Sequence, residues 1–256
     1  MASLATQPSL RYPKAVEPRK PEHPDPFAEA FLERLQDRPE AEQFVLGGGF
    51  ALKHYLDFRA TADIDAWWRA APDLGALEAA REAFADVADR FGYSVRERAS
   101  GTMTSIEAVN GHRKVFSFQV AVRDVEIERP VRSPWGRFPI ETADENVAAK
   151  MNALVNRGAP RDFRDIREIV AAGIATTERC WQLWFAKNPG RDAGEARREV
   201  QRLLAGIEAR RPLERLAPAE RERAAELRAW FRTVFAAEPL GLDHGDEQHD
   251  AEEHPR

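Results

Sequence analysis

Apolar residues at helical spacing predict two helices in the first third of the chain. The dipeptide Asp25-Pro26 has the residue types favoured at an N-cap and at the first helical position, and residues 27–35 continue with an apolar stripe. From Leu74 to Phe91, apolar residues recur every three or four positions. We expect the second of these helices to pack on a sheet.

Four short runs are typical of strands. The run Phe44–Leu46 precedes three glycines, and a short helical pattern over residues 50–56 follows them. The other three runs come after the second helix and cover Tyr93–Arg98, Thr102–Val109 and Lys114–Val122. Asn110-Gly111 lies between the last two runs and predicts a two-residue hairpin turn.

The chain becomes helical after a linker marked by Pro130, Pro134 and Pro139. Thr142 and Glu145 have the spacing of a capping box, and Gly158 has the residue type that ends helices. We therefore expect a helix over residues 142–157, followed by helices over 161–172, 177–186, 192–209 and 218–236.

The two ends of the chain have different compositions. Residues 1–24 carry five prolines and no periodicity, which predicts a flexible leader. The last residues are strongly acidic and predict a disordered tail. The resulting division is a leader over 1–24, an α+β domain over 25–140, a helical domain over 141–238 and a tail over 239–256.

Composition narrows the class of protein without assigning a function. The chain has 256 residues, 43% of them hydrophobic, and a formal net charge of −5. Such a charge gives no general attraction to nucleic acid, so contact with RNA would need a local basic patch. Cys180 is the one cysteine, which excludes an internal disulfide. We find no apolar run long enough for a membrane span and no signal-peptide core, so we expect a cytoplasmic protein.

Asp63-Ile64-Asp65 is the first candidate for chemistry. Successive side chains of a strand alternate between its faces, so both carboxylates would point the same way, with their Cα atoms roughly 6.5 to 7 Å apart. Such a pair can share a hard divalent cation, while Ile64 would face the core. Upstream, Gly47–Gly49 leads into a helix N-terminus, whose free N–H groups suit an anion. Together these features match the needs of nucleotidyl transfer.

The order of these residues resembles the nucleotidyltransferase superfamily, most closely its AbiEii/AbiGii-like toxin branch. The signature of that branch reads roughly Gly-Gly-x-Ala-Leu, then Arg-x-Ser/Thr-x-Asp-hydrophobic-Asp. Eight residues of this sequence match it: Gly48, Gly49, Ala51, Leu52, Arg59, Thr61, Asp63 and Asp65.

A second motif of the same branch lies in the helical part. Lys150 to Arg157 resembles its Lys-x-x-Ala-Leu-x-x-Arg helix, and Arg161 to Asp165 resembles the Arg-Asp-aromatic-x-Asp segment that follows. Lys150 and Arg157 are seven residues apart and so share a helix face, where they could hold phosphates and stabilise the leaving pyrophosphate. Asp162 and Asp165 could orient the lysine or act as a base. The alternative is ordinary helix electrostatics, with Asp162 in the first turn and an i,i+4 ion pair joining Arg161 to Asp165.

The superfamily usually has a third carboxylate on the strand after the Asp-x-Asp pair. Here the polar residue of that run is Gln119, which is uncharged and a poor general base. Asp124 and Glu126 lie just downstream and are the alternatives. This departure puts complete two-metal chemistry in question.

The resemblance covers about residues 44–172 and implies a minimal nucleotidyltransferase fold, an α+β mixed sheet with helices, followed by a helical domain, with the active site between them. It implies transfer of a nucleoside monophosphate from an NTP to an acceptor. Asp63 and Asp65 would hold Mg²⁺, with Mn²⁺ as the alternative, and Lys150, Asp162 and Asp165 would complete the catalytic set. The nucleotide-binding residues would be Gly48, Gly49, Arg59, Thr61, Arg157 and Arg161.

The same resemblance implies a toxin of a type IV toxin–antitoxin or phage-defence system, with a tRNA acceptor and a cognate antitoxin as partners. Two other hypotheses remain open from the residues. One is an NTP-binding module without catalysis, suggested by Gln119. The other is a transferase that modifies a small molecule such as an antibiotic.

The region from Lys187 to Arg232 is locally basic, with twelve Lys or Arg and eight Asp or Glu. These arginines could touch an RNA backbone. We favour the simpler interpretation of a solvated helix face with alternating charges.

Overall fold

The computed structural model describes residues 16–123 and 125–237. The chain forms two compact units, the first ending at Arg191 and the second beginning at Asp192. This division differs from the one at residue 140 that the sequence suggested. The helices over residues 143–187 belong with the sheet, in the first unit.

A mixed sheet forms the centre of the first unit. Within the described residues it has seven strands in the order β3-β4-β5-β2-β1-β7-β6. The pairs β2–β5 and β1–β7 are parallel, and the remaining neighbours are antiparallel. This sheet with its helices confirms the predicted α+β class. The strands are β1 (Phe44–Gly47), β2 (Asp63–Trp68), β3 (Ser94–Ser100), β4 (Met103–Asn110), β5 (Arg113–Ala121), β6 (Val131–Arg132) and β7 (Pro139–Ile140).

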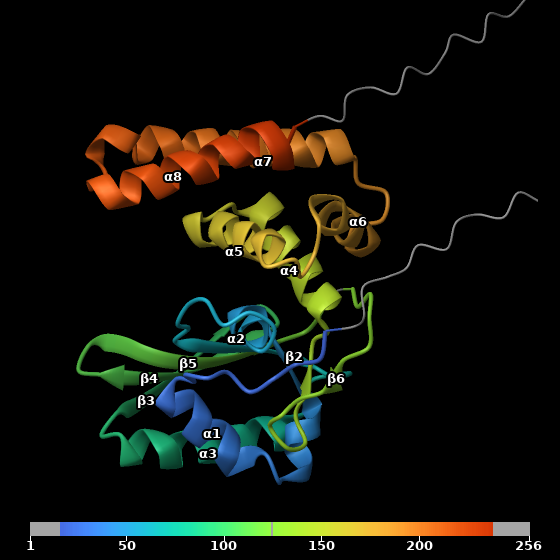
Figure 1. Cartoon of the computed structure of the whole chain (residues 1–256). Helices are drawn as coiled ribbons and strands as arrows, with labels where there is room; N and C mark the ends of the chain where they lie inside the picture. The colour runs from blue at the N-terminus through green and yellow to red at the C-terminus, as the bar shows by residue number, and fades with distance from the viewer. Residues whose placement is uncertain (1–15, 124, 238–256) are drawn as a thin grey trace, which may run out of the picture. The chain divides into compact units, whose positions relative to one another are not determined.

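One face of the sheet is covered by α1 (Pro26–Leu35) and α3 (Leu74–Arg90), as Figure 1 shows. Aromatic rings fill the space between them. The ring centroids of Phe27 and Phe116 are 4.9 Å apart, and those of Phe31 and Phe118 are 5.0 Å apart. Both helices lie where the apolar spacing predicted them, and Asp25 caps α1 by accepting from two backbone N–H groups.

The opposite face of the sheet carries polar residues. Along β2, Ile64, Ala66 and Trp68 are buried, while the alternate positions are half-buried. The short helix α2 (Gly48–Lys53), which follows β1 directly, and α4 (Ala143–Asn156) lie on this side (Figure 1). The strand therefore separates an apolar core from a polar layer.

Two further helices, α5 (Pro160–Ala171) and α6 (Thr177–Lys187), complete the first unit. The Thr142 hydroxyl accepts from the Glu145 N–H at 3.1 Å, as the capping box predicts. The Glu145 carboxylate instead accepts from the backbone N–H groups of Ile127 and Glu128, so only half of the box forms. That carboxylate fastens the preceding loop to α4.

The second unit contains α7 (Ala193–Arg210), a 3₁₀ turn η2 (Leu213–Arg215), α8 (Pro218–Trp230) and a π-helical turn η3 (Phe231–Phe235). The helix predicted over 218–236 thus changes type after Trp230. Several arginines here form ion pairs with acids of the same unit, such as Arg211 with Glu220 at 3.0 Å. Pairs of this kind are typical of a solvated helix face.

The structure corrects two local predictions. Residues 16–24 were expected to be flexible, yet Arg19 N–H donates to the His54 carbonyl at 2.9 Å, and His23 O accepts from Lys53 Nζ at 2.8 Å. The turn between β4 and β5 is Gly111-His112 rather than Asn110-Gly111, since Asn110 still pairs within the ladder. Gly111 has φ +60°, a conformation that glycine adopts without strain.

Residues 1–15 of the predicted leader and the whole predicted tail lie outside the described residues. Among the described residues, no helix is both long enough and apolar enough to span a membrane.

Candidate functional site

The Asp63 and Asp65 side chains project from the polar face of β2, as the strand alternation predicted. Thr61 Oγ1 donates a hydrogen bond to Asp63 Oδ1. The Asp65 carboxylate accepts no hydrogen bond from any described residue. Burial, followed by the nearby charge of Asp63, raises the pKa of Asp65. Two carboxylates on one face, one of them without a donor, fit a hard divalent cation.

Three cations offset the repulsion between the carboxylates of Asp63 and Asp65. The charges of Lys150, Arg161 and Arg157 all lower the pKa of Asp65, which places them within electrostatic range of it. Lys150 lies on α4, Arg157 caps its end, and Arg161 lies in the first turn of α5. The two motifs, about ninety residues apart in sequence, therefore meet on one side of the sheet.

Asp165 connects the two motifs directly. Both of its oxygens accept from Arg59, at 2.8 Å each, and Oδ2 also lies 3.0 Å from Lys150 Nζ. Burial alone would raise the pKa of this carboxyl, but the hydrogen bonds and charges of Arg59 and Lys150 outweigh it and lower the pKa. The i,i+4 ion pair with Arg161 expected from helix spacing is absent from the ion pairs of the described residues.

Asp162 has a separate partner. Its two oxygens accept from Arg157 Nη2 at 2.8 Å and Nε at 2.9 Å, and Oδ2 also accepts from the Ala159 N–H at 2.9 Å. The carboxylate is buried, while about half of the Arg157 side chain is exposed. Asp162 thus holds one side of Arg157 and leaves the rest open to solvent.

The glycine turn lies against these residues. Gly48 has φ +61°, and a Cβ added there would lie 2.7 Å from Asp65 Cγ, so only glycine fits. A Cβ on Gly49 would lie 3.1 Å from Arg59 Nη2 and 3.5 Å from Thr61 Oγ1. The backbone of the turn therefore borders Asp65 on one side and Arg59 with Thr61 on the other.

Gln119 occupies the place where a third carboxylate was expected. It pairs with Asp65 across the parallel strands β2 and β5, and its Nε2 donates to Ser117 Oγ at 3.3 Å. Of the two alternatives, Glu126 forms an ion pair with Arg123, and Asp124 lies outside the described residues. The described residues contain no cluster of three or more His, Cys, Asp or Glu side chains arranged for a metal.

Sequence reasoning missed a second set of polar residues beside the glycine turn. Glu141 is fully buried and accepts from Trp67 Nε1 at 2.7 Å and from Arg123 Nη2 at 2.8 Å. Asn146, also fully buried, bonds to both Glu141 and Gly48. Asn146 precedes Lys150 by four residues and so shares its helix face, which is the one sequence signal that could have identified it.

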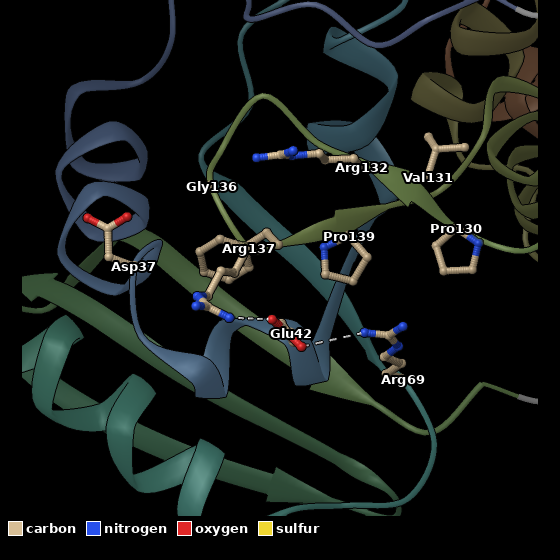
Figure 2. Close-up of a pocket in the computed structure, with 10 residues that line it drawn as sticks. Asp37, Glu42, Arg69, Pro130, Val131, Arg132, Gly136, Arg137 and Pro139 are labelled. Atoms are coloured by element: carbon tan, nitrogen blue, oxygen red, sulfur yellow. Dashed lines mark hydrogen bonds and ion pairs between the residues drawn. The ribbon is translucent and has the colours of Figure 1, made fainter.

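An open pocket of about 620 Å³ lies elsewhere on the first unit (Figure 2). Arg69, which follows β2, lines it, so the pocket is at the opposite end of that strand from Asp63. Glu42 in this pocket pairs with Arg137 at 2.6 Å and with Arg69 at 4.0 Å. None of the predicted site residues lines it.

A family of known proteins matches most of this chain. The family model described as nucleotidyl transferase AbiEii toxin, type IV toxin–antitoxin system, matches residues 30–250. A search of curated proteins found no significant match. Among solved structures, this chain is similar to a proposed nucleotidyltransferase from H. pylori, with 15% identity and a TM-score of 0.48 over 80% of this chain and 90% of that one. The family model carries the assignment.

Proposed function

The chain belongs to the AbiEii nucleotidyl transferase toxin family of type IV toxin–antitoxin systems, and we propose that its active centre is the group of residues around Asp65. In this proposal the protein transfers a nucleoside monophosphate from an NTP to an acceptor and releases pyrophosphate. One observation carries it: two carboxylates on β2 face three cations from α4 and α5. A magnesium-bound triphosphate needs carboxylates for the metal ion beside cations for the phosphates.

Asp63 and Asp65 are the residues that would hold Mg²⁺ or Mn²⁺. The free carboxylate of Asp65 and its raised pKa favour this role, because the charge is poorly compensated by the protein alone. The bound ion would supply charge neutralisation at the α-phosphate. Thr61 orients Asp63 by its hydrogen bond.

Lys150, Arg157 and Arg161 would bind the phosphate oxygens of the NTP. Lys150 is nearly buried, while Arg157 and Arg161 have exposed side chains that can reach a ligand. A cation at this position stabilises the negative charge that develops on the departing pyrophosphate. Gly48 and Gly49, which border Asp65 and Arg59, would add backbone N–H groups.

Asp165 acts in this proposal as a positioning residue and not as a base. A base must accept a proton near neutral pH, but two cations lower the pKa of Asp165 and occupy both oxygens. Arg59 would act on the nucleotide site indirectly, because it holds the same carboxylate. Asp162 orients Arg157 in a parallel way.

The acceptor and the setting are further parts of the proposal, taken from what the family resemblance implies. We propose an RNA acceptor, with tRNA as the first to test, and a cognate antitoxin as partner, in a cytoplasmic phage-defence role. The second candidate function is an NTP-binding module without turnover. Gln119 beside Asp65 is the observation that favours it, because the third carboxylate is missing from this position of the described strands.

The test is incubation with each radiolabelled NTP, Mg²⁺ or Mn²⁺, and total tRNA. The variant Asp63→Ala/Asp65→Ala removes the carboxylate pair, and Asp86→Asn, an exposed acid paired with Arg34, is the matched control. Label on RNA from wild type and the control, but not from the double variant, would support the proposal. If wild type binds NTP in the presence of the metal but transfers no label, the binding module is favoured. If wild type neither binds NTP nor transfers label, the proposed site is refuted.

A further inference from the structure

We propose that Asn146 positions the Gly48–Gly49 turn for the triphosphate of the NTP, and that Glu141 fixes the orientation of the Asn146 amide. This rests on the proposed function. Neither residue would touch the reacting atoms, so both are positioning residues.

The Asn146 amide has one possible orientation. Its Nδ2 donates to the Gly48 carbonyl at 2.9 Å and to Glu141 Oε2 at 2.7 Å. A carbonyl and a carboxylate only accept hydrogen bonds, so the reversed amide would place an oxygen against both of them. The Asn146 Oδ1 is buried and accepts no hydrogen bond in the described part of the chain.

Glu141 can hold this orientation because its other oxygen is held as an acceptor too. Oε1 accepts from Trp67 Nε1 and Arg123 Nη2, at 2.7 and 2.8 Å. Arg123 is itself nearly buried and lies 3.4 Å from Glu145. Burial raises the pKa of Glu141, and the charge of Arg123 opposes that shift. The ionised carboxylate presents Oε2 to the Asn146 amide as an acceptor only.

Gly48 is the residue at which this network meets the nucleotide site. A Cβ at Gly48 would overlap Asp65, so the Gly48 backbone passes directly beside that carboxylate. Fixing the Gly48 carbonyl therefore fixes the N–H groups of the turn relative to Asp65. Asn146 and Lys150 are one turn apart on α4, so a single helix positions both the turn and a phosphate-binding cation.

Glu141→Gln is the decisive variant, since it keeps the volume of the side chain. Its Oε1 must still accept from Trp67 and Arg123, which leaves its NH₂ facing the Asn146 NH₂. Asn146 then loses that bond, or reverses and places Oδ1 against the Gly48 carbonyl. We expect KM for the NTP to rise about tenfold, the size of one lost hydrogen bond, with a smaller change in kcat.

Asn146→Ala should raise KM for the NTP by the same amount. Asn146→Gln keeps the amide, so its KM should lie between those of Asn146→Ala and wild type. The matched control is Tyr55→Phe. It removes a partly buried hydrogen bond of 2.6 Å to the Glu141 backbone carbonyl, whereas the Asn146 amide bonds to Gly48 and to the Glu141 side chain. It should leave KM unchanged.

Steady-state kinetics and equilibrium dialysis of Mg·NTP would be measured on all variants that melt as folded proteins. Wild-type KM and Kd in folded Glu141→Gln would overturn the inference, and so would an equal rise in Tyr55→Phe, which indicates general loosening. If Asn146→Ala fails to fold, Glu141→Gln decides alone. If wild type neither binds nor turns over NTP, the proposed function fails, and this inference fails with it.

Discussion

Gln119 lies in register with Asp65 on the neighbouring parallel strand and directs its amide nitrogen to Ser117, 3.3 Å away. Across the two strands, the carboxylate of Asp65 therefore has a neutral amide as its neighbour. Two carboxylates instead of three lower the repulsion within the site when no cation is bound. The same change lowers the charge available to a bound ion.

Gln119→Glu would add the third carboxylate. Without divalent cations we expect a lower melting temperature, because a further negative charge beside Asp65 adds to a site where burial and Asp63 already disfavour ionisation. With Mg²⁺ the loss should be recovered, so the Mg²⁺-induced rise in melting temperature should exceed that of wild type. Thermal denaturation with EDTA or Mg²⁺ measures both. An equal shift in the two proteins would show that residue 119 does not face the ion.

Asp165→Asn should cost more stability than Asp162→Asn. The partners of Asp165 are 19% and 10% exposed, so removing the carboxylate leaves two largely buried cations unpaired. Arg157, the partner of Asp162, is 52% exposed and can be solvated instead. We expect a loss of about 3 kcal/mol in the free energy of unfolding for Asp165→Asn and about 1 kcal/mol for Asp162→Asn.

Urea denaturation gives both values. Equal losses would mean that the Arg59–Asp165–Lys150 group is solvated in the folded protein. Combining Asp165→Asn with Arg59→Gln should cost less than the sum of the single changes, because both remove the same interaction.

Gly48→Ala should destabilise the protein by about 3 kcal/mol, since it combines a positive φ with an overlap between Cβ and Asp65. Gly173→Ala is the control for the backbone alone. It also has positive φ but meets nothing within 4 Å, so about 1 kcal/mol is expected. Similar losses at both positions, measured by chemical denaturation, would contradict the close approach of Gly48 to Asp65.

His54 should make stability depend on pH in the acidic range. Burial lowers the pKa of His54 from 6.5 to about 4, and Trp135 Nε1 lies 2.7 Å from its Nε2, which must accept. Between those two pH values the unfolded chain binds more protons than the folded one. The stability contributed by neutral His54 is therefore complete above pH 6.5 and is lost as the pH falls toward 4, by roughly 3 kcal/mol in all.

The measurement is the free energy of unfolding between pH 4 and 7.5 for wild type and His54→Gln. The slope below pH 6.5 should be smaller in the variant. His112→Gln, on the exposed turn between β4 and β5, should keep the wild-type slope. If His54→Gln also keeps it, carboxylates and not His54 cause the acid sensitivity.

Features set by local spacing were predictable from the sequence. The helix α3 and the two faces of β2 follow from apolar periods of 3.6 and 2, which depend only on neighbouring residues. The family motifs added Lys150 and Asp165, which the fold does bring to Asp65 and Arg59.

Features set by long-range pairing were not predictable. Helix spacing offered Arg161 as the alternative partner of Asp165, but Arg59, 106 positions earlier in the chain, binds that carboxylate. Residues 16–24 show no periodicity, yet their backbone finds partners at His54 and Lys53. Asn146 and Glu141 belong to no recognised motif. Their importance appears only when α4 is placed beside the glycine turn.

The alternation along β2 also links correct folding to the proposed activity. Shifting this strand by one residue would turn Asp63 and Asp65 into the aromatic core and expose Ile64. Its register is fixed by β5, which ends fifty-three residues later at Ala121, and the cations that face it come from segments up to α5. During synthesis, a ribosome-bound chain that ends before Asp165 would therefore lack a complete centre. In the proposed function, transfer activity would therefore begin only after α5 has left the ribosome.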